Sequence, residues 1–191
     1  MRRRRLPALA LSLLLSLAAC GHSDGPLDIA IIGAEEDVFA SGLRLSEGAQ
    51  VLRGATGAGL VALDAQGEIK PALADRWIVT DDGKSYIFRL REGTWPDGAD
   101  LGGASARDAI RQVIRALRGT SLGLDLAPID EVRAMAGRVV EIDLKAPMPD
   151  FLRLLAQPEL ALSHRGVQAG PMVLERPRKT AGESRPAELT F

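Results

Sequence analysis

The stretch GLVALDAQGEIKPALADRWIVTDDGKSYIFRLREGTWPDG, residues 59–98, carries the pattern that decides the fold. Two runs rich in β-branched and aromatic residues, 77–80 and 85–90, flank the turn sequence DDG at 81–83. Such runs around an Asp-Gly turn predict an antiparallel β-hairpin. Because side chains alternate along a strand, one face of the second run collects three large apolar residues: Tyr86, Phe88 and Leu90.

The sequence around this block predicts further short elements. Apolar runs predict strands at 27–32, 60–63 and 160–162, and alternation predicts one at 138–144. Helical turns are expected at 46–52, 71–74 and 150–156.

A longer helix is predicted to begin at Ser105, with Ser105 as N-cap and Asp108 as its capping-box partner. Its apolar positions fall on one helical face: Ala109, Ile110, Val113, Ile114 and Leu117. Four arginines fall mainly elsewhere on the helix: Arg107, Arg111, Arg115 and Arg118. A solvated face is the favoured interpretation of these arginines, and an anion site is the alternative.

The first twenty residues have the parts of an export signal. Four arginines, residues 2–5, precede an apolar run at 6–19 that ends in Leu17-Ala18-Ala19-Cys20. The run is shorter than the roughly 20 apolar residues that span a bilayer. A basic start, a short apolar stretch and small residues before the cut are typical of secretory signals. The end of the run resembles the lipobox of bacterial lipoproteins, which predicts cleavage before Cys20 and acylation of its thiol.

Charge and composition exclude several kinds of partner and chemistry. The chain has 24 Lys+Arg, four of them in the signal, and all 25 Asp+Glu follow Cys20, so the mature part is near −5. That balance argues against nucleic acid or an anionic lipid surface as partner. The sequence has no Gly-rich phosphate loop and no metal-ligand cluster, so we expect no cofactor. His22 reads as a linker residue, and Ser163-His164 as an adjacent pair without triad geometry, so we expect no enzyme activity.

The motifs of residues 59–98 resemble those of the solute-binding lipoproteins of peptide/nickel-type ABC importers, bacterial extracellular solute-binding protein family 5. That family's pattern runs through "GL", an acidic turn, "P-x-LA-x-x-W", "DDG", "Y-x-F-x-LR-x-G", an aromatic residue and "DG". This sequence supplies each part in order: Gly59-Leu60, Asp64 to Gly67, Pro71, Leu73-Ala74, Trp77, Asp81-Asp82-Gly83, Tyr86, Phe88, Leu90-Arg91, Gly93, Trp95 and Asp97-Gly98. Weaker similarity continues through residues 105–108, 139–147, 151–156 and 170–171.

The resemblance implies a mixed α/β (α+β) fold, the first lobe of a periplasmic binding protein. Family members enclose their ligand between two lobes, and the second lobe is absent from this sequence, as are the return strands of the first. The expected organisation is a signal peptide at 1–19, a lipidated tether at 20–26, a lobe-one portion at 27–172 and a polar C-terminal segment at 173–191, with truncation there as an open alternative.

The function implied by the resemblance is capture of peptides or similar small solutes in the periplasm and delivery to ABC permease subunits. The protein would sit on the periplasmic side of the cell envelope, anchored to a membrane through its lipid. Ligands in open α/β sheets lie beyond the carboxyl ends of strands, so the residues carried over as ligand-facing are Gly33, Ala34, Glu35 and Glu36. The alternative is an envelope lipoprotein with a structural or partner-docking role. Core packing, rather than stacking on a ligand, is expected of four aromatic residues: Trp77, Tyr86, Phe88 and Trp95.

Overall fold

The computed structural model describes residues 46–172, and a four-stranded antiparallel sheet in the order β3-β4-β6-β5 lies at its centre. The strands are β3 (Ala74–Val79), β4 (Ser85–Leu90), β5 (Ile129–Ala134) and β6 (Val139–Leu144). The mixed α/β fold class expected from the sequence is confirmed. Several predicted features lie outside the described residues: the strand at 27–32, Cys20, and the ligand-facing residues Gly33, Ala34, Glu35 and Glu36.

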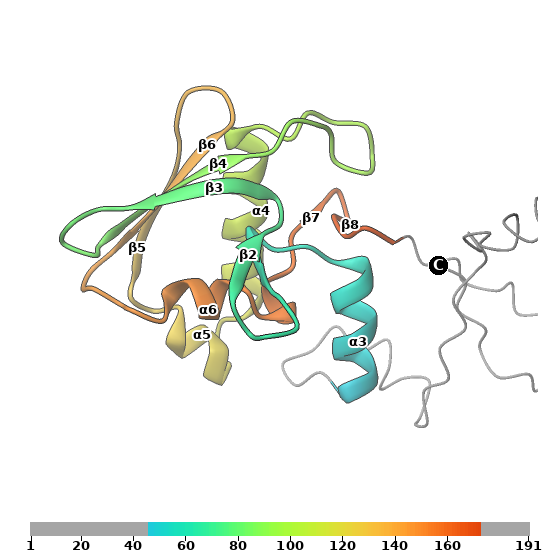
Figure 1. Cartoon of the computed structure of the whole chain (residues 1–191), viewed down its shortest axis with the longest axis horizontal. Helices are drawn as coiled ribbons and strands as arrows, with labels where there is room; N and C mark the ends of the chain where they lie inside the picture. The colour runs from blue at the N-terminus through green and yellow to red at the C-terminus, as the bar shows by residue number, and fades with distance from the viewer. Residues whose placement is uncertain (1–45, 173–191) are drawn as a thin grey trace, which may run out of the picture.

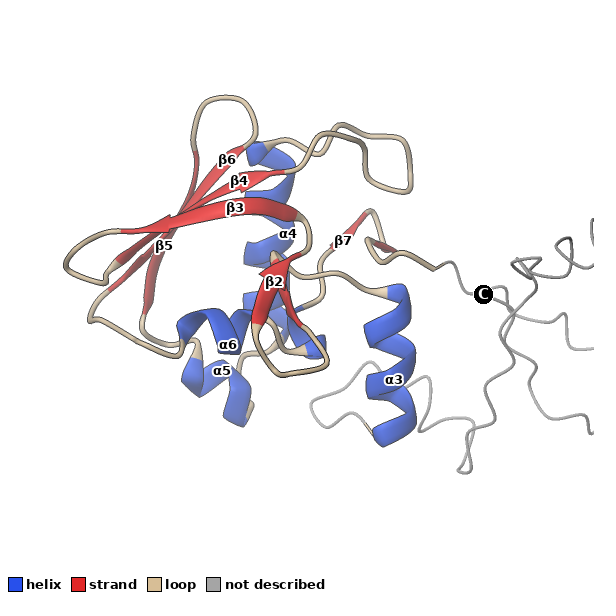
Figure 2. Cartoon of the chain, viewed as in Figure 1, coloured by secondary structure: helices blue, strands red, loops and turns tan. Residues whose placement is uncertain are grey.

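The helix α4 (Gly103–Ala116) packs against β5 and β6 on one face of this sheet (Figure 1). The other elements are α3 (Glu47–Thr56), β1 (Val61–Leu63), β2 (Ile69–Pro71), α5 (Ser121–Asp125), α6 (Phe151–Leu155), the 3-10 turn η2 (Pro158–Leu160), β7 (Ser163–His164) and β8 (Val167–Gln168). β1 pairs with β2, and β7 pairs with β8, as two small hairpins separate from the main sheet (Figure 2). α3 packs against η2.

The β3–β4 turn forms for reasons visible in its residues. The Asp82 carboxylate accepts hydrogen bonds from the Thr80 hydroxyl, at 2.6 Å, and from the Lys84 N–H, at 3.1 Å. Gly83 has φ +66°, a backbone conformation that glycine adopts without steric cost. The hairpin predicted from the DDG sequence is therefore confirmed.

The core lies between the helix-covered face of the sheet and the surrounding helices and loops. Phe88 stands opposite Trp77 on β3 and Val140 on β6. The largest fully buried side chains are those of Trp95, Phe88 and Phe151. The Tyr86 ring packs against Phe151 with centroids 4.7 Å apart, and its hydroxyl donates to the Met148 carbonyl. Burial in the low-dielectric core raises the pKa of the Tyr86 hydroxyl.

Two of the shorter predicted elements are wrong. Residues 71–74 form no helical turn, because the N–H groups of Leu73 and Ala74 bond the carbonyls of Gly59 and Leu60. At 160–162, Leu160 ends the 3-10 turn η2, Ala161 follows as its C-cap, and Leu162 makes only an isolated bridge with Ala58. Long-range backbone pairing, absent from any local pattern, decides the first of these conformations.

The start of α4 also differs from the prediction. The N-cap is Gly102, and Ser105 occupies the third helical position, where its hydroxyl accepts from the Gly102 N–H at 3.2 Å. Asp108 therefore is not a capping partner; it pairs with the neighbouring Arg107. Between residues 46 and 172, no helix is long and apolar enough to cross a membrane.

Candidate functional site

The described residues bring two distant segments together, the loop at 91–101 and the hairpin β7–β8. The loop contains a tight turn in which the Gly98 N–H bonds the Trp95 carbonyl at 2.9 Å. Gly98 has φ +84°, and the Asp97 carboxylate accepts from the Ala99 N–H. The turn therefore fixes the direction of the Asp97 side chain.

Asp97 is bound to a histidine 67 positions further along the chain. Its Oδ2 lies 2.7 Å from Nδ1 of His164, and the two side chains are 13% and 21% exposed. The His164 ring stacks on Trp95 with centroids 5.3 Å apart. The Trp95 Nε1–H donates to the Ser105 hydroxyl at 2.9 Å, which ties this cluster to the start of α4.

The electrostatics of the cluster favour an ionised Asp97. Desolvation raises the pKa of this carboxyl, but four other effects outweigh it: the hydrogen bonds from His164 and from the Ala99 N–H, and the charges of His164 and Arg165. The net pKa of Asp97 lies below its ordinary value. Arg165 is held nearby with φ +49°, the one positive φ of a non-glycine residue in 46–172. The pair therefore fastens the β7–β8 hairpin to the loop.

A hollow of about 220 Å³ opens beside this cluster. It is lined by the loop and by the chain after β8: Leu73, Arg91, Thr94, Trp95, Pro96, Gly98, Leu101, Ala169 and Gly170. Arg91 supplies the charge in this lining and Thr94 a hydroxyl, while the apolar lining residues Leu73, Trp95 and Leu101 are themselves only 1–2% exposed. A surface of this mixed kind can contact a small polar solute through both hydrogen bonds and apolar packing.

The structure shows the surroundings of the aromatic residues, the arginines and His164 that the sequence singled out. The aromatic prediction is confirmed for Tyr86, Phe88 and Trp95, which are 4%, 0% and 1% exposed, and Trp77 is half-buried against the core. The four arginines predicted on this helix do not converge: Arg111 donates to the Val132 carbonyl, Arg107 pairs with Asp108, and Arg118 lies beyond the end of α4 at Ala116. The sequence analysis missed the Asp97–His164 pair. The available signal was the Ser-His-Arg-Gly sequence at 163–166, in which a glycine favours a turn close to His164.

The described part of the chain holds no group of three or more His, Cys, Asp or Glu side chains arranged to bind a metal ion. The hydrogen bond of His164 to Asp97 is through Nδ1, and no hydroxyl or thiol among residues 46–172 bonds its Nε2. The Asp97–His164 pair thus joins the β7–β8 hairpin to the loop at 91–101, beside the hollow.

Residues 68–188 match the family model described as "Bacterial extracellular solute-binding proteins, family 5 Middle". The chain belongs to this family. The matched range covers most of the described fold, from β2 through α4 to β8. The family resemblance drawn from residues 59–98 is therefore confirmed.

Two curated relatives of this family 5 member are both from Escherichia coli K12. One is the "Probable deoxycholate-binding periplasmic protein YgiS", 34% identical over 53% of this chain and 22% of its own length. The other is the "Glutathione-binding protein GsiB", 31% identical over 65% of this chain and 23% of its own length. The chain spans less than a quarter of the length of these relatives.

A solved structure supports the same assignment. The substrate-binding domain of an oligopeptide ABC transporter from Bacillus anthracis str. Ames is 25% identical, with a TM-score of 0.60. The match covers 73% of this chain and 32% of that one. This family 5 chain therefore corresponds to about a third of a known binding-protein structure.

Proposed function

We propose that the chain is a substrate-binding lipoprotein of an ABC importer, which captures peptides or similar small solutes in the periplasm and delivers them to permease subunits. The observation that carries the proposal is the family match over residues 68–188, whose signature aromatic residues form the core of the described fold. The similarity to an oligopeptide-transporter domain and to a glutathione-binding protein favours a peptide-like solute. The sequence ending at Cys20 supports lipid anchoring.

We place one wall of the solute site at the hollow beside Trp95. Complete small-molecule pockets enclose about 300–1,000 Å³ and bury most of the ligand surface. The hollow, at about 220 Å³, is smaller and open, as one wall of a two-lobed site would be. The loop at 33–36 remains a second proposed contact, and it lies outside the described residues.

Saturation-transfer NMR tests the proposal, because it detects solutes that bind only in the millimolar range. Residues 21–191 are incubated with a tripeptide, glutathione and deoxycholate in separate samples. We expect transfer to the peptides, reduced by Thr94→Trp, whose indole fills the hollow, and unchanged by Gln66→Trp in the exposed β1–β2 turn. Absence of transfer to every peptide would overturn the function, whereas equal transfer with Thr94→Trp would overturn only the placement of the site.

A further inference from the structure

The face of the main sheet opposite α4, called here the outer face, has an unusual division of charge. Along β4, Tyr86, Phe88 and Leu90 are buried, whereas Arg89 is exposed. The strand register places five other side chains of the outer face in rows across the sheet: Arg76, Ile78, Glu141, Arg133 and Glu131. The outer face thus runs from arginines on β3 and β4 to carboxylates on β5 and β6.

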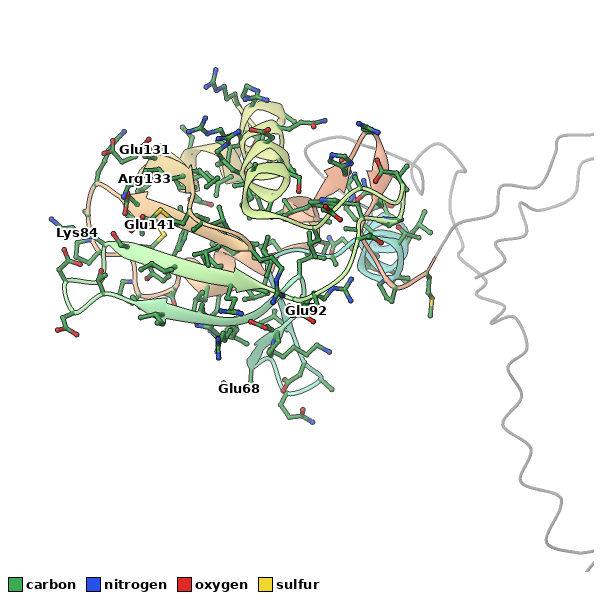
Figure 3. The ribbon with its side chains drawn as sticks, turned by 90° about the horizontal axis from the view of Figure 1, so that it is seen from above. Glu68, Lys84, Glu92, Glu131, Arg133 and Glu141 are labelled. Carbon is green, nitrogen blue, oxygen red and sulfur yellow. The ribbon has the colours of Figure 1, made fainter. Side chains whose placement is uncertain are left out.

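The β5–β6 end of the outer face is acidic. Arg133 lies between Glu131 and Glu141 (Figure 3), with a nitrogen 3.0 Å from each carboxylate, and 2.6 Å from Asp143. Hydrogen bonds to Glu141 and Glu131, together with the charges of Asp143 and Glu141, raise the pKa of Arg133 against a smaller opposing effect of desolvation. The Ser85 hydroxyl also bonds Asp143. One cation therefore faces three carboxylates, and a negative charge remains.

The β3–β4 end is basic, and its arginines have no counter-ion among the described residues. Arg76 and Arg89 stand directly opposite each other in the strand register, and both are exposed. Like charges at directly opposed positions destabilise a sheet. No carboxylate among residues 46–172 forms an ion pair with either arginine. This includes Asp75, which lies in the bulge beside Arg76. An acidic partner at this end would therefore relieve the repulsion between Arg76 and Arg89.

Apolar side chains separate the two charged ends. Ile78, on the edge strand β3, is 65% exposed and stands opposite Ile87 on the inner strand β4. Ile78 thus lies beside two arginines that form no ion pair within 46–172, and arginine is among the residues enriched at protein interfaces.

We propose that the outer face is a self-association surface, on which a second copy of this chain docks face to face about a two-fold axis. Arg76 and Arg89 of each copy then meet the acidic end, Glu131, Glu141 and Asp143, of the other. A two-fold axis makes each contact twice, so a surface with one basic and one acidic end complements itself. The basic end and the acidic end lie at diagonally opposite corners of the outer face. A two-fold axis that places the basic corner of one copy on the acidic corner of the other also makes the strands of the two sheets cross, as in orthogonal sheet packing.

The second copy is favoured over other acidic partners because the complementary patch is on the same face. A membrane surface offers anionic charge but has no cation to meet Glu131 and Asp143, and the mature chain is itself near −5. The face of one short sheet is small beside a standard interface of about 1,600 Å² in total, so we expect a weak dimer, with a dissociation constant above about 1 μM. This inference does not depend on the proposed solute.

Sedimentation velocity of residues 21–191 over increasing concentration tests the proposal through charge complementation. Variant A is Arg76→Glu/Arg89→Glu, which makes both ends acidic, and variant B is Glu131→Lys/Glu141→Gln, which leaves both ends basic. We expect each variant alone to dimerise at least about tenfold more weakly than the wild type, and an equimolar mixture of A and B to restore dimers. Added salt should weaken the wild-type dimer.

The matched control is Arg115→Glu/Arg118→Glu, which makes the same charge change on exposed positions of and just after α4. It should dimerise as the wild type does, and circular dichroism should show that all variants keep their fold. A wild type that stays monomeric to about 1 mM, or a dimer insensitive to variant A, would refute the proposal. So would a monomer that binds phosphatidylglycerol vesicles through Arg76 and Arg89, which would assign the face to a membrane.

Discussion

Phe88 has no exposed surface and lies between two strands of the sheet, facing Trp77 and Val140. Phe88→Ala removes its ring from a packed core, so we expect a loss of about 3–5 kcal/mol in the free energy of unfolding. The matched control is Ile78→Ala on the neighbouring strand, where the side chain is 65% exposed and the expected loss is below about 1 kcal/mol. Chemical denaturation of both variants measures the difference, and equal losses would mean that Phe88 is not a core residue.

The Asp97–His164 pair predicts a pH dependence of stability. The pKa of Asp97 is lower in the folded chain than its ordinary value of about 3.9, so the pair's contribution is complete above that value. It is lost as pH falls through the lowered pKa of the folded state. Wild type should therefore exceed Asp97→Asn in unfolding free energy at pH 6, and the difference should shrink on acidification to pH 2.

Urea unfolding at a series of pH values measures this difference. His164→Gln provides the comparison, because it keeps a hydrogen-bond donor near Asp97 but cannot carry a charge. A difference between wild type and Asp97→Asn that stays constant from pH 6 to pH 2 would contradict the assignment of the lowered pKa to this pair.

Strands that contribute one apolar face to the core are the elements that the sequence predicts well. β4 and β6 alternate strictly between buried and more exposed residues, and their pattern is visible without the structure. The edge strand β5 escaped prediction because Val132 is its one buried side chain, while Asp130, Glu131 and Arg133 are exposed. Its position is set by pairing with β6, a contact that no local pattern records.

The start of α4 gives a prediction that distinguishes the observed N-cap at Gly102 from the capping box of Ser105 and Asp108 expected from the sequence. Ser105 bonds the Gly102 N–H and accepts from the buried Trp95 indole, whereas Asp108 caps nothing. Ser105→Ala should lower the unfolding free energy by about 1–2 kcal/mol, since it leaves the Trp95 donor unsatisfied. Asp108→Asn should change it by less than about 0.5 kcal/mol. Thermal unfolding decides between them, and a larger loss in Asp108→Asn would restore the capping box at Ser105.

At the scale of the molecule, the sequence predicted the family but not the described site. The family motif is a run of neighbouring residues, 59–98, and such a run can be read directly. The hollow instead joins Arg91 and Trp95 to Gly170, and His164 reaches Asp97 across 67 positions. These approaches depend on how β7–β8 returns to the loop, which composition and spacing do not encode.

The hollow also limits how tightly the chain alone should bind a solute. One open wall leaves much of a peptide in water, so its polar groups exchange water for protein with little net gain. If two comparable walls together give micromolar affinity, near −8 kcal/mol, one wall gives about −4 kcal/mol, in the millimolar range. Isothermal titration of residues 21–191 with tri- to hexapeptides should therefore show dissociation constants near about 1 mM or weaker. A micromolar constant from a monodisperse monomer would show that the residues of this chain suffice to enclose the ligand, and that the hollow beside Trp95 is not the whole of the site.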